Sequence, residues 1–357
     1  MTVSATSSLM PSYTNPGRMI ADGIPYSDFV NVSQKIEAGG SWFDEWMAVA
    51  TKYEALGREA LASGKSESAG RWLWLASLSA HYAQYMWFHE PDVRQAGQKR
   101  KQELYLEAAP HLNPRAQRFD LDFEEWTIPG YIRLPQGAEG PHPWVVLLGG
   151  LESTKEESLL FEDLCLERGI ATVAFDGPGQ GELFAQTALR PDFHRFTNAV
   201  VEYAQSRDEL DDHRIAIFGR SFGGYYAMRS AASQPLFRAC VSWGGAFDLS
   251  NYPNMSPTHQ AGFMYVAGYE ADDEAGYEQL QKDINLRDFA ADITCPLLML
   301  HGAHDSVFSE AALESVKATF RNADLTLRVE PNGDHCCHNM ADEVRPMLAD
   351  WLAERLR

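Results

Sequence analysis

A serine lies between two glycines in Gly219-Arg220-Ser221-Phe222-Gly223, directly after the apolar run Arg214–Phe218. Where G-x-S-x-G ends a strand and opens a helix, it forms a strained turn that lifts the serine hydroxyl clear of the sheet. The glycines are needed because neighbouring backbone comes too close for a side chain. A plain tight turn is the alternative, but few such turns follow an apolar strand. The pattern therefore predicts that Ser221 is a nucleophile.

A serine nucleophile needs a base that takes its proton and an acid that orients the base. Two downstream segments supply them in the chain order Ser, Asp, His that accompanies this kind of turn. Asp305 comes shortly after the strand-like run Pro296–Leu300, and His335 comes shortly after Leu325–Val329. We therefore expect Ser221, Asp305 and His335 to form a catalytic triad.

Each partner of the serine has an alternative explanation. Asp305 could cap a helix that begins near Ser309, since carboxylates are good N-caps. His338 competes with His335 as the base. We favour His335 because it follows a Gly-Asp turn directly after the strand.

Acyl chemistry also needs donors for the oxygen that becomes negative. The backbone N–H of Phe222 is one candidate, and the loop after the first core strand should supply the other from Leu151 or Glu152. We take Leu151 as that second donor. An ionised Glu152 beside this site would oppose the developing charge, so it needs a raised pKa or an acid/base task. Alternatively, Glu152 caps the helix that follows.

The chain contains no clear metal or cofactor motif, and we expect neither. His301, His304, Cys336 and Cys337 lack the paired ligand spacing of a zinc site. The glycine-rich segment Asp176–Glu182 lacks the G-x-G-x-x-G spacing of a dinucleotide loop. Its glycines are expected to shape a loop that walls the active site.

The elements that must position these residues alternate between strands and helices. An antiparallel pair is expected at 119–123 and 125–134. Continuous apolar runs, typical of a parallel sheet covered on both faces, follow at 144–148, 170–175, 215–218, 239–243, 296–300 and 325–329. A polar, aromatic insert at 250–290 interrupts the alternation and is expected to form a lid. The sequence predicts an α/β fold with a mostly parallel central sheet.

The first part of the chain has a different, helical character. Residues 1–20 are expected to be a flexible leader, 21–114 an all-helical domain, and 115–357 the catalytic domain. Five of the nine tryptophans lie in the helical part and either hold the helices together or line a pocket: Trp42, Trp46, Trp72, Trp74 and Trp87. Trp72, Tyr82 and Trp87 are our candidates for substrate binding.

The composition narrows the class of protein. The 357 residues include 50 acidic and 30 basic ones, a formal charge of −20 that argues against binding nucleic acid or an anionic membrane surface. The charge says little about the substrate, because an acidic exterior is also a common solubility device; we expect a small molecule. The five cysteines form no C-x-x-C pair and are expected to be buried, reduced thiols. The first residues lack the pattern of a secretory signal, so we expect a cytoplasmic protein.

The assembled motifs resemble those of a family of α/β-hydrolases related to 2,6-dihydroxypseudooxynicotine hydrolase, a carbon–carbon bond hydrolase. The family also includes esterases and enzymes that trim acyl chains from fungal polyketides. The helical stretch LWLASLSAHYAQYMW is similar as well, so the resemblance covers nearly the whole chain. The matching motifs are GGLESTKEES (149–158), FDGPGQGE (175–182), GRSFGG (219–224), SWGG (242–245), HGAHD (301–305) and GDHCCHN (333–339).

The resemblance implies an α/β-hydrolase fold with an N-terminal helical cap over the active site, and a homodimer. It implies a triad of Ser221, Asp305 and His335, with Glu152 as an additional functional residue. The expected reaction is hydrolysis of a carbon–carbon bond next to a ketone; the alternative is a carboxylesterase or thioesterase acting on a small aromatic or polyketide metabolite. Phe222 and the 250–290 insert depart from the family's pattern, which leaves the substrate open.

Overall fold

The chain divides after Asn113 into two units, each with its own internal packing. A computed structural model describes residues 16–88, 90–137, 140–308 and 317–357. Most of the expected leader, residues 1–15, lies outside these ranges. The leader prediction is wrong for residues 16–20, because they belong to helix α2 (Pro16–Ala21), where Met19 is buried.

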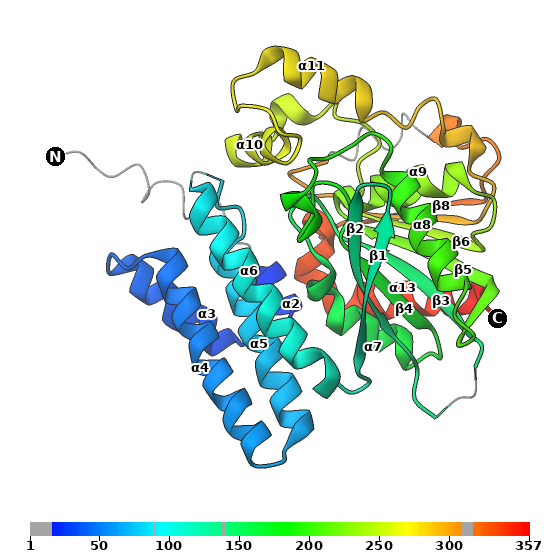
Figure 1. Ribbon diagram of the computed structural model, residues 1–357. Coiled ribbons are helices and arrows are strands. Elements are labelled where there is room, and N and C mark those ends of the chain that lie inside the picture. Colours follow the sequence, from blue (N-terminus) through cyan, green and yellow to red (C-terminus); the bar gives the residue numbers. More distant parts are fainter. Residues whose placement is uncertain (1–15, 89, 138–139, 309–316) are drawn as a thin grey trace. The chain divides into compact units, whose positions relative to one another are not determined.

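The first unit consists of helices, coloured blue to cyan in Figure 1. The centre of the unit is α5, which packs against both α4 and α6 and is buried at every position from Leu73 to Gln84. A helix that is buried on all sides needs apolar or small residues around its whole circumference, which explains its Ala- and Leu-rich sequence. The helices after α2 are α3 (Tyr26–Glu37), α4 (Trp42–Ala62), α5 (Ser66–Gln84) and α6 (Pro91–Ala108).

The second unit is built on one sheet of eight strands in the order β1-β2-β4-β3-β5-β6-β7-β8. Strands β1 and β2 pair antiparallel with each other, and β2 pairs antiparallel with β4. All pairs from β4 to β8 are parallel. The strands are β1 (Ala116–Phe123), β2 (Trp126–Arg133), β3 (His142–Leu148), β4 (Ala171–Phe175), β5 (Leu210–Arg220), β6 (Ala239–Trp243), β7 (Leu297–Gly302) and β8 (Leu325–Glu330).

This sheet confirms the predicted fold class, an α/β fold with a mostly parallel sheet. All eight predicted strands are present, with ends that differ by up to about five residues. The largest difference is in β5, which begins at Leu210 because Leu210 pairs with His142 ahead of an irregularity in β3. The polar residues Asp211–Arg214 hid this extension from a search for apolar runs.

Helices cover both faces of the sheet, as Figure 1 shows. Successive strand residues point to opposite faces. In β5, Ile215 and Ile217 join the core beneath α8 (Phe193–Gln205) and α9 (Phe222–Ser233). Ala216 and Phe218 join the opposite core with α7 (Leu159–Leu166) and α13 (Ala341–Arg355). Burial on both faces explains the continuous apolar runs of the inner strands.

The direction of the chain changes beside β3. After β3 the chain adds β4 on one side and then returns to add β5 on the other. In open parallel sheets, ligands bind outside the carboxyl ends of the strands where such a reversal occurs. The ends of β3 and β5 at Leu148 and Arg220 are therefore where a site is expected from topology alone.

The insert at 250–290 is largely helical, with α10 (Pro257–Val266) and α11 (Glu274–Asp283). Ser256 caps α10 and Asp273 caps α11 through side chains that accept backbone N–H groups. Phe263 of α10 packs edge-on against Phe222 at a ring separation of 5.1 Å, so the insert contacts the residue after Ser221. The role of the insert as a lid stays a prediction.

All five cysteines are free and buried, as the sequence predicts: Cys165, Cys240, Cys295, Cys336 and Cys337. Among the helices that the structure describes, none combines the length and the apolar character needed to cross a membrane.

Candidate active site

Ser221 occupies a strained turn between β5 and α9. Its backbone has φ 56° and ψ −131°, a conformation that side-chain-bearing residues rarely adopt. A Cβ on Gly219 would lie 1.9 Å from the Gly223 carbonyl oxygen, and one on Gly223 would lie 2.3 Å from that of Leu148. Both flanking glycines are thus required by close backbone contacts. The turn holds the serine at the carboxyl end of β5.

Ser221, His335 and Asp305 form one hydrogen-bonded chain. The Ser221 hydroxyl lies 2.7 Å from Nε2 of His335, and Nδ1 of His335 lies 2.8 Å from Oδ2 of Asp305. His335 comes from the segment after β8, and Asp305 from the segment after β7. The structure therefore brings together three residues that are 30 or more positions apart in the sequence.

Asp305 makes a second set of bonds with its other oxygen. Oδ1 accepts the backbone N–H groups of Val307 at 2.7 Å and Phe308 at 2.9 Å. These bonds orient the carboxylate so that Oδ2 faces His335. The helix that Asp305 could cap, beginning near Ser309, lies outside the described residues. The N–H groups of Val307 and Phe308 bind Oδ1 and His335 binds Oδ2, so a capping role and the bond to His335 do not exclude each other.

Burial and charge act against each other in the Asp305–His335 pair. Burial raises the pKa of Asp305, but the charge and hydrogen bond of His335 outweigh it, so that the pKa lies below the ordinary aspartate value. Burial lowers the pKa of His335, but the Asp305 carboxylate raises it well above the ordinary histidine value. The pair therefore favours an imidazolium, the form that a base reaches after taking a proton from serine.

The neighbouring histidines, including the competing His338, lie in other environments, although His301 Nε2 also lies 3.4 Å from Oδ2 of Asp305. His338 is buried against the Trp243 ring. His301 donates to the carbonyl of Phe308 at 2.5 Å, and His304 is exposed. Geometry thus selects His335 as the partner of the serine.

Phe222 directly follows Ser221, and Leu151 directly follows Gly150, which borders the serine. Phe222 begins α9, and the N–H groups of a helix's first turn have no acceptor inside the helix. Gly150 borders the serine from the other side, because a Cβ at this position would lie 3.3 Å from the Ser221 hydroxyl oxygen. Leu151 follows in the same turn, residues 149–154, which we call the Gly149–Thr154 turn. Its assignment as a donor stays a prediction.

Glu152 is 7 % exposed within the Gly149–Thr154 turn. The alternative that it caps the next helical segment is wrong, because Thr154 is the N-cap of that segment (Lys155–Ser158). The Thr154 N–H donates to the Glu157 carboxylate at 2.7 Å, which completes a capping box.

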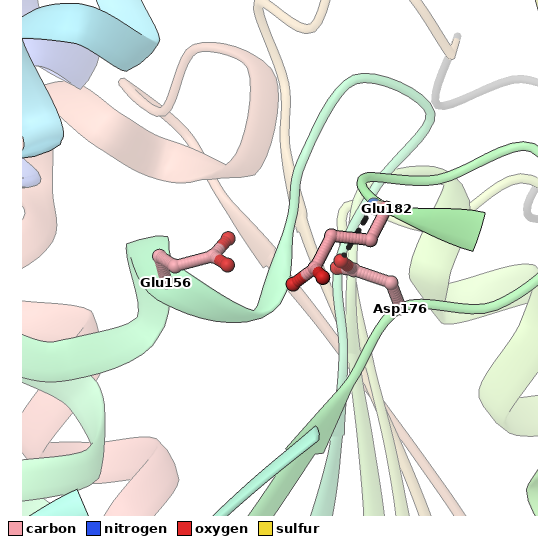
Figure 2. A group of neighbouring side chains, drawn as sticks. All are labelled: Glu156, Asp176 and Glu182. Carbon is pink, nitrogen blue, oxygen red and sulfur yellow. Dashed lines mark hydrogen bonds between the residues drawn. The ribbon is translucent and has the colours of Figure 1, made fainter. Parts of the chain in front are cut away.

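Four charged residues lie beside this turn, three of them buried and Glu182 partly exposed, and we call them the Lys155 cluster: Lys155, Glu156, Asp176 and Glu182. The Lys155 ammonium contacts the carboxylates of Glu156 at 2.6 Å, Asp176 at 2.7 Å and Glu182 at 2.6 Å. Figure 2 shows the three carboxylates gathered in one place, close enough for one oxygen of each to share a cation. Lys155 supplies that cation. Although burial lowers its pKa, the carboxylates raise it above the ordinary lysine value.

Sequence reasoning missed several residues that hold the turn in place. Arg220, beside the nucleophile, donates to Glu157 at 3.0 Å and to the Ser153 hydroxyl at 3.3 Å. Gln180 donates to the carbonyls of Gly149 and Gly150. A charged run such as 155–157 normally indicates a solvated surface. The one available signal was that FDGPGQGE puts a glutamine between glycines directly after a buried strand.

The three candidates for substrate binding belong to the helical unit. Tyr82 is buried, and its hydroxyl donates to Asp22 at 2.9 Å. Trp87 is buried and donates to Glu90 at 3.0 Å, while Trp72 is half-buried. Their assignment to substrate binding stays a prediction.

A serine on a strained strand-to-helix turn, at the carboxyl edge of a mostly parallel sheet covered by helices, defines an α/β-hydrolase. Within that class, the chain belongs to the esterase FrsA-like family, whose model matches residues 35–267. It is therefore an enzyme, a hydrolase.

Individual relatives agree with this assignment. The chain is 43 % identical to 2,6-dihydropseudooxynicotine hydrolase of Paenarthrobacter nicotinovorans over 100 % of its own length and 95 % of the relative's. It is 34 % identical to the hydrolyase poxO of Penicillium oxalicum over 59 % of the chain and 53 % of that protein. A crystal structure of 2,6-dihydroxy-pseudo-oxynicotine hydrolase superposes with a TM-score of 0.90 at 41 % identity, covering 96 % of both chains. The expected resemblance is thereby confirmed.

Proposed function

We propose that the protein is a serine hydrolase that breaks a carbon–carbon bond next to a ketone, using Ser221, His335 and Asp305 as its triad. The hydrogen-bonded chain from Ser221 through His335 to Asp305, with distances of 2.7 and 2.8 Å, carries the proposal. Such an arrangement turns a weakly nucleophilic hydroxyl into one that attacks carbonyl carbon.

In the first step, Ser221 Oγ bonds to the ketone carbon while His335 Nε2 takes its proton. The carbonyl oxygen becomes an oxyanion, which the N–H groups of Phe222 and Leu151 stabilise. Asp305 stabilises the imidazolium at Nδ1.

Collapse of this intermediate must expel carbon instead of oxygen. The electron pair of the carbon–carbon bond passes to the leaving carbon, which accepts a proton as it departs. An electron-rich ring or a second carbonyl in the leaving half makes the departure of carbon feasible, provided that the carbon is protonated as it leaves. The proton comes from His335, directly or through Glu152, which would bind or protonate a hydroxyl or ring position of that half and regain its proton from His335. The acyl group remains on Ser221.

Water then releases the acyl group. His335 takes a proton from water, the hydroxide adds to the acyl carbon, and Ser221 leaves with the proton. The products are a carboxylic acid and a leaving half that carries hydrogen where the bond was. One water is consumed, and this chain's own residues supply every proton transfer.

One relative favours this reaction over ester hydrolysis, and the family model supports the alternative. The full-length similarity to 2,6-dihydropseudooxynicotine hydrolase supports a ketone substrate. An ester is the second candidate, because the family model is named for an esterase. In that case a carboxylesterase or thioesterase would use the same triad, and Glu152 would only support its turn.

A comparison of turnover on ketone and ester substrates distinguishes the two functions. Purified enzyme is assayed with an aryl ketone, a β-diketone and aryl esters, and Ser221→Ala serves as the reference. We expect ketone cleavage that falls by about 10⁴-fold or more in Ser221→Ala. We expect Glu152→Gln to lose ketone cleavage while retaining ester turnover. Aryl esters turned over far better than every ketone would overturn the carbon–carbon assignment.

The proposal includes four features of the whole protein. We propose that the helical unit caps the active site and that Trp72, Tyr82 and Trp87 contact the substrate. The protein is also proposed to be a cytoplasmic homodimer. Trp72→Ala should raise KM more than it lowers kcat, and light scattering should give twice the mass of one chain.

A further inference from the structure

One side chain, Gln180, holds the Gly149–Thr154 turn from behind. Its amide nitrogen donates to the carbonyl oxygens of both Gly149 and Gly150 at 2.8 Å. Its amide oxygen accepts the Gly177 N–H at 3.1 Å. Because a backbone N–H can only donate, this bond fixes which end of the amide faces the turn. Gln180 is 3 % exposed, so water does not compete for these bonds.

The bond to Gly150 sets the direction of the next N–H group. The Gly150 carbonyl and the Leu151 N–H belong to one peptide group, and in a trans peptide they point in opposite directions. The Gly150 oxygen is turned toward Gln180, and it also accepts the Ser153 N–H at 3.3 Å. The Leu151 N–H is thereby directed away from Gln180. Donation to the carbonyl also polarises the peptide group and strengthens its N–H as a donor.

The loop that carries Gln180 holds the same turn at its far end. Asp176 accepts the Lys155 backbone N–H at 2.9 Å with one oxygen, and the Lys155 ammonium at 2.7 Å with the other. The second oxygen also accepts the Glu182 N–H at 3.0 Å, which Figure 2 marks with a dashed line. The loop thus grips residues 149–150 and 155, and it leaves Leu151–Thr154 between the two attachments.

We propose that Gln180 is a positioning residue of the oxyanion hole. By fixing the Gly149 and Gly150 carbonyls, it aims the Leu151 N–H at the position that the substrate oxyanion will occupy. Gln180 touches no reacting atom, so its effect on catalysis passes through the turn. This inference rests on the proposed serine mechanism and adds a residue to it.

Two substitutions of Gln180 test the inference. Gln180→Met keeps the length of the side chain and removes the donors. Gln180→Glu keeps an acceptor for the Gly177 N–H but turns carboxylate oxygen toward two carbonyl oxygens. Losing an oxyanion donor costs roughly 10²–10³-fold in kcat, and misdirecting one should cost less. We expect kcat for p-nitrophenyl acetate to fall by about 10- to 100-fold in each variant, with KM changed by less than about threefold.

A transition-state analogue distinguishes positioning from general damage. Phenylboronic acid forms a tetrahedral adduct with a nucleophilic serine, and one of its oxygens occupies the oxyanion hole. Its Ki should rise by the factor by which kcat/KM falls, while the melting temperature of at least one variant stays close to that of the wild type. Lost activity with unchanged boronate affinity would overturn the inference, as would wild-type kcat in both variants.

Gln186→Met is the matched control. Gln186 lies in the next segment of the chain, is exposed, and exchanges two hydrogen bonds with the backbone of Thr127 instead of the turn. This variant should keep wild-type kcat and boronate affinity. Failure of the serine mechanism is recognised separately: Ser221→Ala would then keep its turnover, and boronate would not inhibit the wild-type enzyme.

Discussion

Two clusters of charged side chains at the carboxyl edge of the sheet combine the same kinds of groups, but we assign them different roles. The proposed triad pairs the Asp305 carboxylate with His335, which in the proposed mechanism takes part in proton transfer. The Lys155 cluster surrounds one ammonium with three carboxylates. Both place acidic side chains next to a nitrogen that can carry charge, within a few residues of the ends of β strands.

The clusters differ in how completely the nitrogen is engaged. The ammonium of Lys155 has three hydrogens and three carboxylate partners, and its side chain has no exposed surface. His335 keeps 16 % of its side chain exposed, and its Nε2 faces the hydroxyl of Ser221. A nitrogen with every hydrogen committed holds position, whereas one with a labile partner can move a proton. The two clusters therefore differ less in their residue types than in whether every hydrogen of the charged nitrogen is already bonded.

Replacing Asp305, the acid of the proposed triad, should have the largest effect, and the effect should be on activity. In Asp305→Asn, the amide oxygen keeps the N–H groups of Val307 and Phe308, so the NH₂ group faces His335. Nδ1 must then accept, Nε2 carries the proton, and the ring cannot take the proton of Ser221. We expect kcat to fall by about 10⁴-fold with KM little changed. Steady-state kinetics at high enzyme concentration measure this, and a fall of less than tenfold would remove Asp305 from the triad.

Replacing Lys155, the cation of the Lys155 cluster, should instead lower the stability of the fold. Lys155→Met leaves three carboxylates without their shared ammonium, and breaking a buried ion pair costs about 3–5 kcal/mol of unfolding free energy. Urea unfolding followed by circular dichroism measures the loss. Lys282→Met, at an exposed position of α11, should change stability by less than about 0.5 kcal/mol. If both variants unfold alike, the Lys155 cluster contributes nothing to stability.

The sequence predicted the grouping of the proposed triad residues better than that of the Lys155 cluster, and the reason is physical. Ser221, Asp305 and His335 each follow an apolar strand, and parallel strands bring their carboxyl ends to one edge. Periodicity and chain order were therefore enough to bring them together. Lys155 lies in a charged run that resembles a solvated surface, and its burial depends on contacts with Asp176 and Glu182, more than 20 residues away.

The same reasoning explains the errors in local structure. The expected leader overlapped α2 because burial of Met19 depends on packing that a local pattern does not contain. Glu152 was a plausible cap because both it and Thr154 precede the helical segment, and the capping box with Glu157 decides between them. Gln180 went unnoticed because its bonds are to backbone carbonyls, which every sequence has. Hydrogen bonds from a side chain to the backbone are therefore the hardest to predict from a sequence.

The smallest effect that we predict is a dependence on pH, and it connects stability with activity. The pKa of His335 is higher in the folded protein than the ordinary value of about 6.5. A histidine with a raised pKa stabilises the fold fully below its unfolded pKa, and it loses that contribution as pH rises through the folded pKa. The base, however, works only when it is unprotonated. The form of His335 that stabilises the fold is therefore the inactive one.

The unfolding free energy should thus fall over the same pH range in which kcat/KM rises. Below the His335 pKa, kcat/KM should decrease about tenfold per pH unit, with a midpoint above about 6.5. In Asp305→Asn the carboxylate that raises the pKa is gone, so the midpoint of the residual activity should move to lower pH and the opposing trend in stability should shrink. Lys155→Met leaves this pair intact and should not move the midpoint. A midpoint that moved in Lys155→Met as far as in Asp305→Asn would show that the two clusters titrate together, and their division into scaffold and catalytic site would then be wrong.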